Sequence, residues 1–293
     1  MKGVIIKGVG GLYSIKCGEQ ILECRARGRF RKEQMTPLVG DFVEVADGCI
    51  TEIYDRKNAL IRPACANIDK LFLVTALSSP DPVIYNIDKM LAIAYYHHIE
   101  PILVFSKSDL PDVCHLKQIY QQVPIKQVFV SDRLDCTDAL NVLKKEIQGC
   151  TVVLSGLSGA GKSTLMNLLG GLSLQTGSVS KKLGRGRHTT RSVELFELCG
   201  GYVSDTPGFS NLELDYFSIS DRGLLADCFP EFLSYQGTCR FSDCMHGSEP
   251  GCSVVEAVHR GEIAASRWES YRKMYDQLGV FEAWKEKKKP ELK

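Results

Sequence analysis

Hydrophobic and polar positions change their spacing twice along this 293-residue chain. Up to residue 66, short apolar segments are separated by glycines and polar turns, which is typical of strands in a small β-barrel. These segments lie at 3–6, 12–15, 21–24 and 41–45. We therefore predict an all-β domain over residues 1–66.

From residue 67 to 218, apolar strands alternate with helical segments, which predicts a mostly parallel sheet with flanking helices. Strands are expected at 70–75, 102–105, 127–130, 151–154, 193–196 and 201–204, and helices at 87–98, 137–147 and 162–169. Beyond residue 218 the spacing is helical and is interrupted by a cluster of cysteine and histidine residues. The pattern predicts an α/β multidomain protein with domains at 1–66, 67–218 and 219–293.

The composition, with 44% hydrophobic residues, supports a substantial core and excludes a largely disordered chain. No apolar run approaches the ~18 residues of a membrane span, and none resembles a signal peptide. We expect a cytoplasmic monomer with no membrane partner. Its twelve cysteines then lie in a reducing compartment, where metal binding or core packing is their expected role. Because the net charge is only +1, a nucleic acid would have to be bound by local basic patches.

A glycine-rich loop joins the strand at 151–154 to the helical segment that follows it. Its spacing, Gly156-x4-Gly161-Lys162-Ser163, satisfies the phosphate-binding P-loop pattern, for which a chance match is the alternative. Glycines let backbone amides face phosphate oxygens at a helix N-terminus, while Lys162 neutralises the β and γ phosphates and Ser163 binds Mg²⁺. The predicted contacts are Gly156, Leu157, Ser158, Gly159, Ala160, Gly161, Lys162, Ser163 and Thr164.

The base is indicated by the segment Ser106, Lys107, Ser108 and Asp109, which follows the strand at 102–105 and resembles the Asn-Lys-x-Asp guanine box. A carboxylate can accept hydrogen bonds from both N1–H and the N2 amino group of guanine, whereas adenine offers an acceptor at N1. Asp109 therefore predicts guanine and argues against an ATP-dependent kinase or ATPase. Ser106 replaces the usual asparagine, whose amide supports the base and the neighbouring loops.

Alone, this short motif is also compatible with a surface turn. Ser131 favours the guanine site, because it ends the next strand, where GTPases place a small residue whose backbone contacts the guanine oxygen. Both features precede the P-loop, so the order of motifs is circularly permuted relative to ordinary GTPases. A permuted chain can form the same sheet because domain termini often lie close together at the surface.

Two segments after the P-loop resemble GTPase switches. His188, Thr189 and Thr190 form a candidate switch I, and Asp205 and Gly208 delimit the Asp-x-x-Gly pattern of switch II. We expect Asp205 to bind Mg²⁺ through water, and either Thr189 or Thr190 to close over the ion. Switch II leads directly into the C-terminal domain, so a change there on hydrolysis can be passed on.

Cys239, Cys244, His246 and Cys252 supply three thiolates and one imidazole within fourteen residues, the ligand set of a structural zinc site. Four protein ligands leave no open position for catalysis, so the zinc is expected to replace a small hydrophobic core. Unrelated core cysteines beside a surface histidine are the alternative, because the Cys-x4-Cys-x-His spacing is uncommon.

Two stretches are strongly basic. Arg25, Arg27, Arg29 and Arg31 alternate with other residues, so in a strand their guanidinium groups share one face. That face is a candidate RNA surface, and a charged edge that prevents strand pairing is the alternative. The second stretch lies in the candidate switch I and is expected to contact RNA or phosphate. It contains Lys181, Lys182, Arg185 and Arg187.

Taken together, these motifs resemble the RsgA family of small-ribosomal-subunit-dependent GTPases, also called YjeQ or YloQ. The resemblance covers nearly the whole chain and also rests on 26–32, 39–41, 62–69, 184–190 and 205–209. It implies an N-terminal OB-fold β-barrel, a central circularly permuted P-loop GTPase and a C-terminal helical zinc-binding domain. It further implies binding to the small (30S) subunit and its rRNA late in maturation, with GTP hydrolysed to GDP, stimulated by the subunit and coupled to release.

The residue after the switch II glycine is Phe209, which cannot orient water as the glutamine of Ras-type enzymes does. His188 is our candidate for that role, and packing or an rRNA contact is the alternative. Phe209 and Ser106 also leave open a different function, an RNA-binding assembly scaffold with a vestigial nucleotide site.

Overall fold

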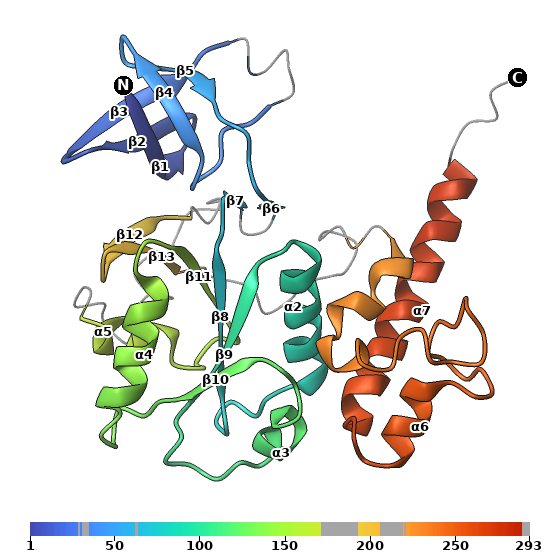
Figure 1. The fold of residues 1–293 in the computed structure, drawn as a ribbon. Helices are drawn as coiled ribbons and strands as arrows, with labels where there is room; N and C mark the ends of the chain where they lie inside the picture. The colour runs from blue at the N-terminus through green and yellow to red at the C-terminus, as the bar shows by residue number, and fades with distance from the viewer. Residues whose placement is uncertain are drawn as a thin grey trace, which may run out of the picture.

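The computed structural model describes residues 1–28, 30, 35–61, 64–170, 193–205, 219 and 221–288. The described residues form a β-barrel, a central sheet flanked by helices, and a C-terminal helical region (Figure 1). This arrangement confirms the predicted fold class.

Five short strands close into the N-terminal barrel in the order β1-β2-β3-β5-β4. Ile5, Ile15 and Ile50 from three of these strands are fully buried, and along the fourth strand Val43 and Val45 alternate as buried residues, as the period of two in a strand requires. The strands are β1 (Lys2–Val9), β2 (Leu12–Cys17), β3 (Gln20–Ala26), β4 (Phe42–Ala46) and β5 (Cys49–Ile53). A hairpin of β6 (Ala59–Ile61) and β7 (Ala64–Ala66), which the apolar spacing did not predict, connects the barrel to the sheet.

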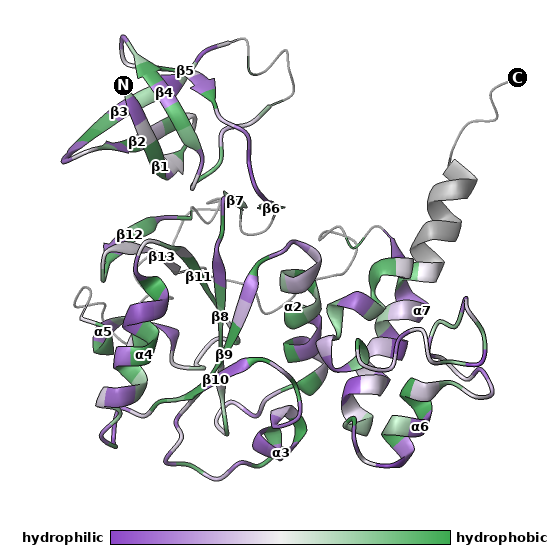
Figure 2. Ribbon diagram, viewed as in Figure 1, coloured by the Kyte–Doolittle hydropathy of each residue, from purple (hydrophilic) through white to green (hydrophobic). Residues whose placement is uncertain are grey.

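The central sheet has six strands in the order β10-β9-β8-β11-β13-β12. Five of the strands are parallel. The inner strands of the sheet are almost entirely hydrophobic, and after its first residue each is buried (Figure 2). The five parallel strands are β8 (Lys70–Ala76), β9 (Glu100–Ser106), β10 (Lys126–Phe129), β11 (Thr151–Ser155) and β13 (Gly201–Asp205).

The edge strand β12 (Leu195–Leu198) runs antiparallel to β13. The two are joined by Cys199 and Gly200, which both have positive φ angles of 53° and 74°. A two-residue turn with two positive φ angles forms a hairpin, so β12 cannot be parallel. The barrel lies against this edge strand through Lys7–Glu194 and Lys16–Glu197 ion pairs of 2.9 and 3.2 Å.

Helices cover both faces of the sheet (Figure 1). Those on one face, α4 (Thr137–Ile147) and α5 (Lys162–Leu168), bury Leu143 and Leu165 against β11 and its neighbours. On the other face α2 (Ile84–Tyr96) separates the sheet from the C-terminal region, and the short α3 (Leu116–Tyr120) lies beside it.

The C-terminal region is built on the long helix α7 (Ala265–Lys288), against which an aromatic cluster packs. Phe229, Phe232 and Tyr271 have ring centroids 5.2–5.4 Å apart. The remaining elements are α6 (Ser253–His259) and three 3₁₀ turns at Arg222–Leu224, Ala226–Cys228 and Pro230–Phe232. Among the described helices, none is long and apolar enough to cross a membrane.

Candidate nucleotide and metal sites

The predicted nucleotide motifs that the structure describes lie at the carboxyl ends of strands in the central sheet. The guanine box follows β9, Ser131 follows β10 and the P-loop follows β11. Asp205 ends β13, and its backbone is in register with Leu154 beside the start of the P-loop. In open parallel sheets ligands bind at this edge, so the fold brings together segments that are far apart in the sequence.

The P-loop has the backbone geometry that its glycines predict. Gly156 has a φ of 143°, and a Cβ there would lie 2.0 Å from the Val74 carbonyl oxygen. Gly161 has a φ of 93° and is followed directly by helix α5. The Lys162 ammonium donates to the carbonyl oxygens of Gly156 and Leu157, both at 2.9 Å, so its charge is held over the loop where phosphates are expected.

A pocket of about 350 Å³ lies between the guanine box and the P-loop. At one wall the Ser131 hydroxyl donates a 2.6 Å hydrogen bond to an Asp109 carboxylate oxygen. The Arg133 guanidinium lies 3.6 Å from the other oxygen and is largely exposed. Gly161 of the P-loop lines the same pocket. A pocket of this size with a few convergent polar groups suits a nucleobase.

The hydrogen bond from Ser131 lowers the pKa of Asp109, and the positive charge of Arg133 lowers it further. Partial burial of the carboxylate acts against both. Asp109 is therefore an ionised hydrogen-bond acceptor at neutral pH. This is the protonation state that the predicted recognition of guanine N1–H and N2 requires.

Ser106, the departure from the usual guanine box, keeps a link between the two loops. Its buried hydroxyl donates to the Ala160 carbonyl oxygen of the P-loop. The neighbouring Lys107 ammonium donates to the carbonyl oxygen of Ser79. The serine hydroxyl therefore supplies a contact between the guanine box and the P-loop in place of the asparagine amide.

The Mg²⁺ ligands predicted from the sequence are Ser163, in the first turn of α5, and Asp205. A hydroxyl and a carboxylate are oxygen donors of the kind Mg²⁺ prefers, and both residues belong to the nucleotide edge of the sheet. Several predicted residues lie outside the described part of the chain. They are Arg29, Arg31, Lys181, Lys182, Arg185, Arg187, His188, Thr189, Thr190 and Gly208.

The four predicted zinc ligands converge. The Sγ atoms of Cys239, Cys244 and Cys252 lie 3.7, 3.8 and 3.6 Å from Nδ1 of His246. With zinc–sulfur bonds of about 2.3 Å and zinc–nitrogen bonds of about 2.0 Å, a regular tetrahedron separates sulfur from nitrogen by about 3.5 Å. The donor set therefore fits a tetrahedral zinc ion, and the alternative of unrelated core cysteines is wrong.

Helix α7 supports the backbone of this ligand loop. Trp268 Nε1 donates to the His246 carbonyl oxygen at 2.8 Å, and the Tyr271 hydroxyl donates to that of Met245 at 2.7 Å. His246 itself is buried and has a positive φ of 54°. Because all four donors come from the protein, the site is structural in type.

Comparisons with known proteins cover the same segments. A family described as RsgA GTPase matches residues 53–215, and one described as RsgA N-terminal domain matches residues 2–50. A small ribosomal subunit biogenesis GTPase RsgA from Clostridium perfringens (strain SM101) is 39% identical in an alignment 286 positions long, which covers 95% of this chain and 98% of the relative. The chain belongs to the RsgA GTPase family.

Two solved structures of RsgA relatives share the fold. YjeQ from Thermotoga maritima is 35% identical with a TM-score of 0.76, covering 94% of this chain and 98% of its own. YloQ, described as a circularly permuted GTPase, is 30% identical with a TM-score of 0.75, covering 96% and 95%. The predicted permutation, with the guanine box before the P-loop, is thereby confirmed for this RsgA chain.

The barrel strand that carries the first basic stretch is short. β3 ends at Ala26, so Arg25 lies within it and Arg27 lies just beyond its end. A turn follows, in which the Phe30 amide donates to the Arg27 carbonyl oxygen at 3.2 Å. Arg25 and Arg27 are both exposed and Phe30 is buried. Arg29 and Arg31 lie outside the described residues, so the shared RNA surface of the four arginines stays a prediction.

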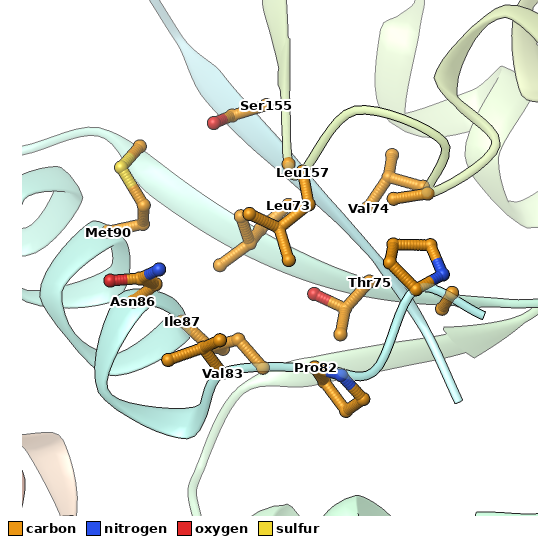
Figure 3. A pocket seen from close by; sticks show the side chains of 14 residues that line it. Leu73, Val74, Thr75, Pro82, Val83, Asn86, Ile87, Met90, Ser155 and Leu157 are labelled. Atoms are coloured by element: carbon orange, nitrogen blue, oxygen red, sulfur yellow. The ribbon is translucent and has the colours of Figure 1, made fainter. Parts of the chain in front are cut away.

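Three features of the nucleotide site were not predicted. Ser79 acts through its backbone carbonyl, and Arg133 reaches Asp109 from the loop after Ser131. The third is a crevice of about 30 Å³ beneath the P-loop, where Leu157 faces side chains of β8 and the first turns of α2 (Figure 3). A contact made by a backbone carbonyl gives no signal in the sequence. The crevice forms between segments that are far apart in the chain, so no local pattern indicates it.

Proposed function

We propose that this chain is a GTPase of small-subunit maturation. It binds the small ribosomal subunit and its rRNA late in assembly, in the cytoplasm, and hydrolyses GTP to GDP and phosphate. Hydrolysis is stimulated by the subunit and coupled to release. The names of the relatives support the partner. The observation that carries the GTP assignment is the ionised Asp109 paired with Ser131, across one pocket from the P-loop.

Mg²⁺ bound with GTP at Ser163 and Asp205 would neutralise developing charge on the phosphates. The residues of the chain do the positioning: P-loop amides and Lys162 orient the phosphates, and Asp109 fixes the base. Zinc at the three cysteines and His246 stabilises the C-terminal region and takes no part in hydrolysis, because its four donors fill a tetrahedron.

His188 positions the attacking water in this proposal, in the place of the glutamine of Ras-type enzymes, and either Thr189 or Thr190 closes over Mg²⁺. The support is chemical: the side chain of Phe209 has no hydrogen-bonding group, and a neutral imidazole is both donor and acceptor. His188→Ala should abolish most of the subunit-stimulated turnover while the affinity for GTP is kept. Unchanged stimulated turnover would show that His188 has another role.

In this proposal Arg25, Arg27, Arg29 and Arg31 contact rRNA, and so does the basic run of the candidate switch I. Arg25 and Arg27 are exposed, as such contacts require. Replacing one of these residues should lower the affinity for the subunit. It should also make the plot of log affinity against log salt concentration less steep, by roughly one unit at most. The basic residues inside the candidate switch I are Lys181, Lys182, Arg185 and Arg187.

The deciding experiment is GTP hydrolysis with purified small subunits added or withheld. We expect slow turnover alone and a rise of at least an order of magnitude with subunits, comparable in kind to the activation of other GTPases by their partners. Large subunits serve as the control. A scaffold with a vestigial nucleotide site would instead bind subunits with the same affinity in GTP, in GDP and without nucleotide.

A further inference from the structure

Helix α2 contacts the P-loop on one side. Val83, Asn86 and Ile87, in and before its first turns, line the small crevice together with Gly156 and Leu157 of the P-loop (Figure 3). The crevice has a volume of about 30 Å³, so little space separates the side chains of the two elements that line it. In so tightly packed a region, a shift of the P-loop is transmitted to α2.

On its other side α2 contacts the C-terminal region (Figure 1). The buried Asp88 carboxylate accepts a 2.7 Å hydrogen bond from Nη1 of Arg267 on α7. One turn earlier, the Tyr85 hydroxyl donates to the Gln277 side-chain oxygen at 2.6 Å, also on α7. Tyr85 and Asp88 are three residues apart and so lie on one side of the helix.

Arg267 is the centre of this contact. It is 1% exposed, and its Nε and Nη2 donate to Glu231, within the C-terminal region, at 2.6 and 3.0 Å. The Tyr120 hydroxyl, from α3, donates to Asp88 at 2.5 Å. Arg267 therefore forms one ion pair inside its own region and a second one with α2, and both exclude water.

We propose that Asp88 and Arg267 are positioning residues for the nucleotide site. Through α2, they couple the conformation of the P-loop to the position of the zinc-bearing region. This inference rests on the proposed GTP binding. Coupling of this kind is reciprocal: if the bound nucleotide shifts α7, then weakening the contact of α7 with α2 must change the relative affinities for GDP and GTP. The route does not require switch II.

Asp88→Asn is the variant that separates coupling from folding. It removes the charge of the contact with α2 but leaves the balanced Arg267–Glu231 pair. Trp268, next to Arg267 and hydrogen-bonded to the zinc loop, is a built-in fluorescent reporter. Trp284 is the one other tryptophan in the sequence, so the full chain carrying Trp284→Phe serves as the parent.

In the parent, saturation with GDP and with a non-hydrolysable GTP analogue should give different Trp268 emission. Asp88→Asn should remove most of that difference and change the ratio of the two affinities, measured with fluorescent nucleotides, by about fivefold or more, the low end of typical coupling. Tyr85→Phe, which loses only the exposed hydroxyl contact, should have the same effects in weaker form and covers the case in which Asp88→Asn fails to fold.

The matched control is Arg260→Met, which breaks an exposed 2.7 Å pair with Glu262 in the same region and should change neither reading. Equal emission with both nucleotides in a parent that binds them would overturn the coupling alone. The coupling would also be overturned if the folded, zinc-loaded Asp88→Asn variant kept both the difference in Trp268 emission and the ratio of GDP to GTP-analogue affinities of the parent. A parent that binds no guanine nucleotide would overturn the proposed function, and this inference with it.

Discussion

The Ser131 hydroxyl donates a 2.6 Å hydrogen bond to the carboxylate of Asp109, and this bond joins two loops 22 residues apart in the sequence. The serine also accepts from the Arg133 backbone amide at 3.0 Å. The side chain that is to recognise the base is thus oriented by the loop expected to contact the same base. Preorganisation of this kind reduces the ordering that binding must otherwise supply.

Ser131→Ala should therefore weaken GDP binding by roughly threefold to tenfold, because a hydrogen bond to a charged group is lost and Asp109 becomes free to rotate. The affinity would be measured by titration with a fluorescent GDP. Thr137→Ala is the matched control, since it removes a 2.7 Å hydroxyl-to-carboxylate bond, to Asp135, in a neighbouring turn. Equal losses in the two variants would show that Ser131 does not act through Asp109.

Glu146 should make stability depend on pH. Its carboxylate pairs with Lys126 and Lys70, which link α4 to β10 and β8, and these pairs, Lys126 first, lower its pKa. A group with a lowered folded pKa contributes stability above its unfolded pKa of about 4.3, and this stability is lost as the pH falls through the folded value.

Glu146→Gln should therefore lower the Tm at neutral pH, and the difference from the parent should shrink as the pH falls below about 4.3. Thermal unfolding at several pH values tests this, and added salt should reduce the neutral-pH difference because the pairs reach the surface. Glu256→Gln, with an exposed partner at 4.0 Å, is the control. A difference that stays constant with pH would contradict the assignment to Glu146.

Gly156→Ala should abolish nucleotide binding. A Cβ would lie 2.0 Å from the Val74 carbonyl oxygen, so the P-loop would have to move away from β8. Gly159→Ala is the matched control: it has a positive φ of 80°, but its Cβ would meet only Pro80 Cδ at 3.7 Å. Fluorescent-nucleotide titration should show a much larger loss for Gly156→Ala, whereas equal losses would point to backbone strain alone.

Cys239→Ala should release zinc and unfold the C-terminal region, because three donors cannot complete the tetrahedron and the ligand loop has little core of its own. Zinc content and Trp268 emission would report the two effects. Cys228→Ala is the control, since Cys228 is buried in the same region but lies outside the ligand set. Retention of zinc by Cys239→Ala, or its loss by Cys228→Ala, would contradict the ligand assignment.

The sequence predicted those parts of the fold that are determined by residues close together in the chain. The strand before Gly156, the helix after Lys162 and the zinc spacing are all determined within short segments. The edge strand was expected at 193–196 and lies at Leu195–Leu198, but its antiparallel direction was not predicted, because apolar spacing carries no direction. The two positive φ angles at Cys199 and Gly200 account for that direction.

Other features join residues that are distant in the sequence. The Ser106 bond to Ala160 spans 54 residues, and the pair of Arg267 with Asp88 spans 179. A single charged residue in a helical pattern is normally interpreted as solvent-exposed, and Asp88 gives no local sign that it is buried. Only the packed structure identifies such a pair.

Arg267→Met should destabilise the protein far more than Asp88→Asn. It leaves the Asp88 and Glu231 carboxylates in a region from which water is excluded, with no cation between them. Removal of one partner from a buried pair costs about 3–5 kcal/mol. Arg260→Met, which removes an exposed pair, should cost about 1 kcal/mol or less. Urea unfolding of the zinc-loaded chains measures both. If Arg267→Met unfolds no more easily than Arg260→Met, the buried ion pairs of Arg267 do not stabilise the contact between α7 and α2.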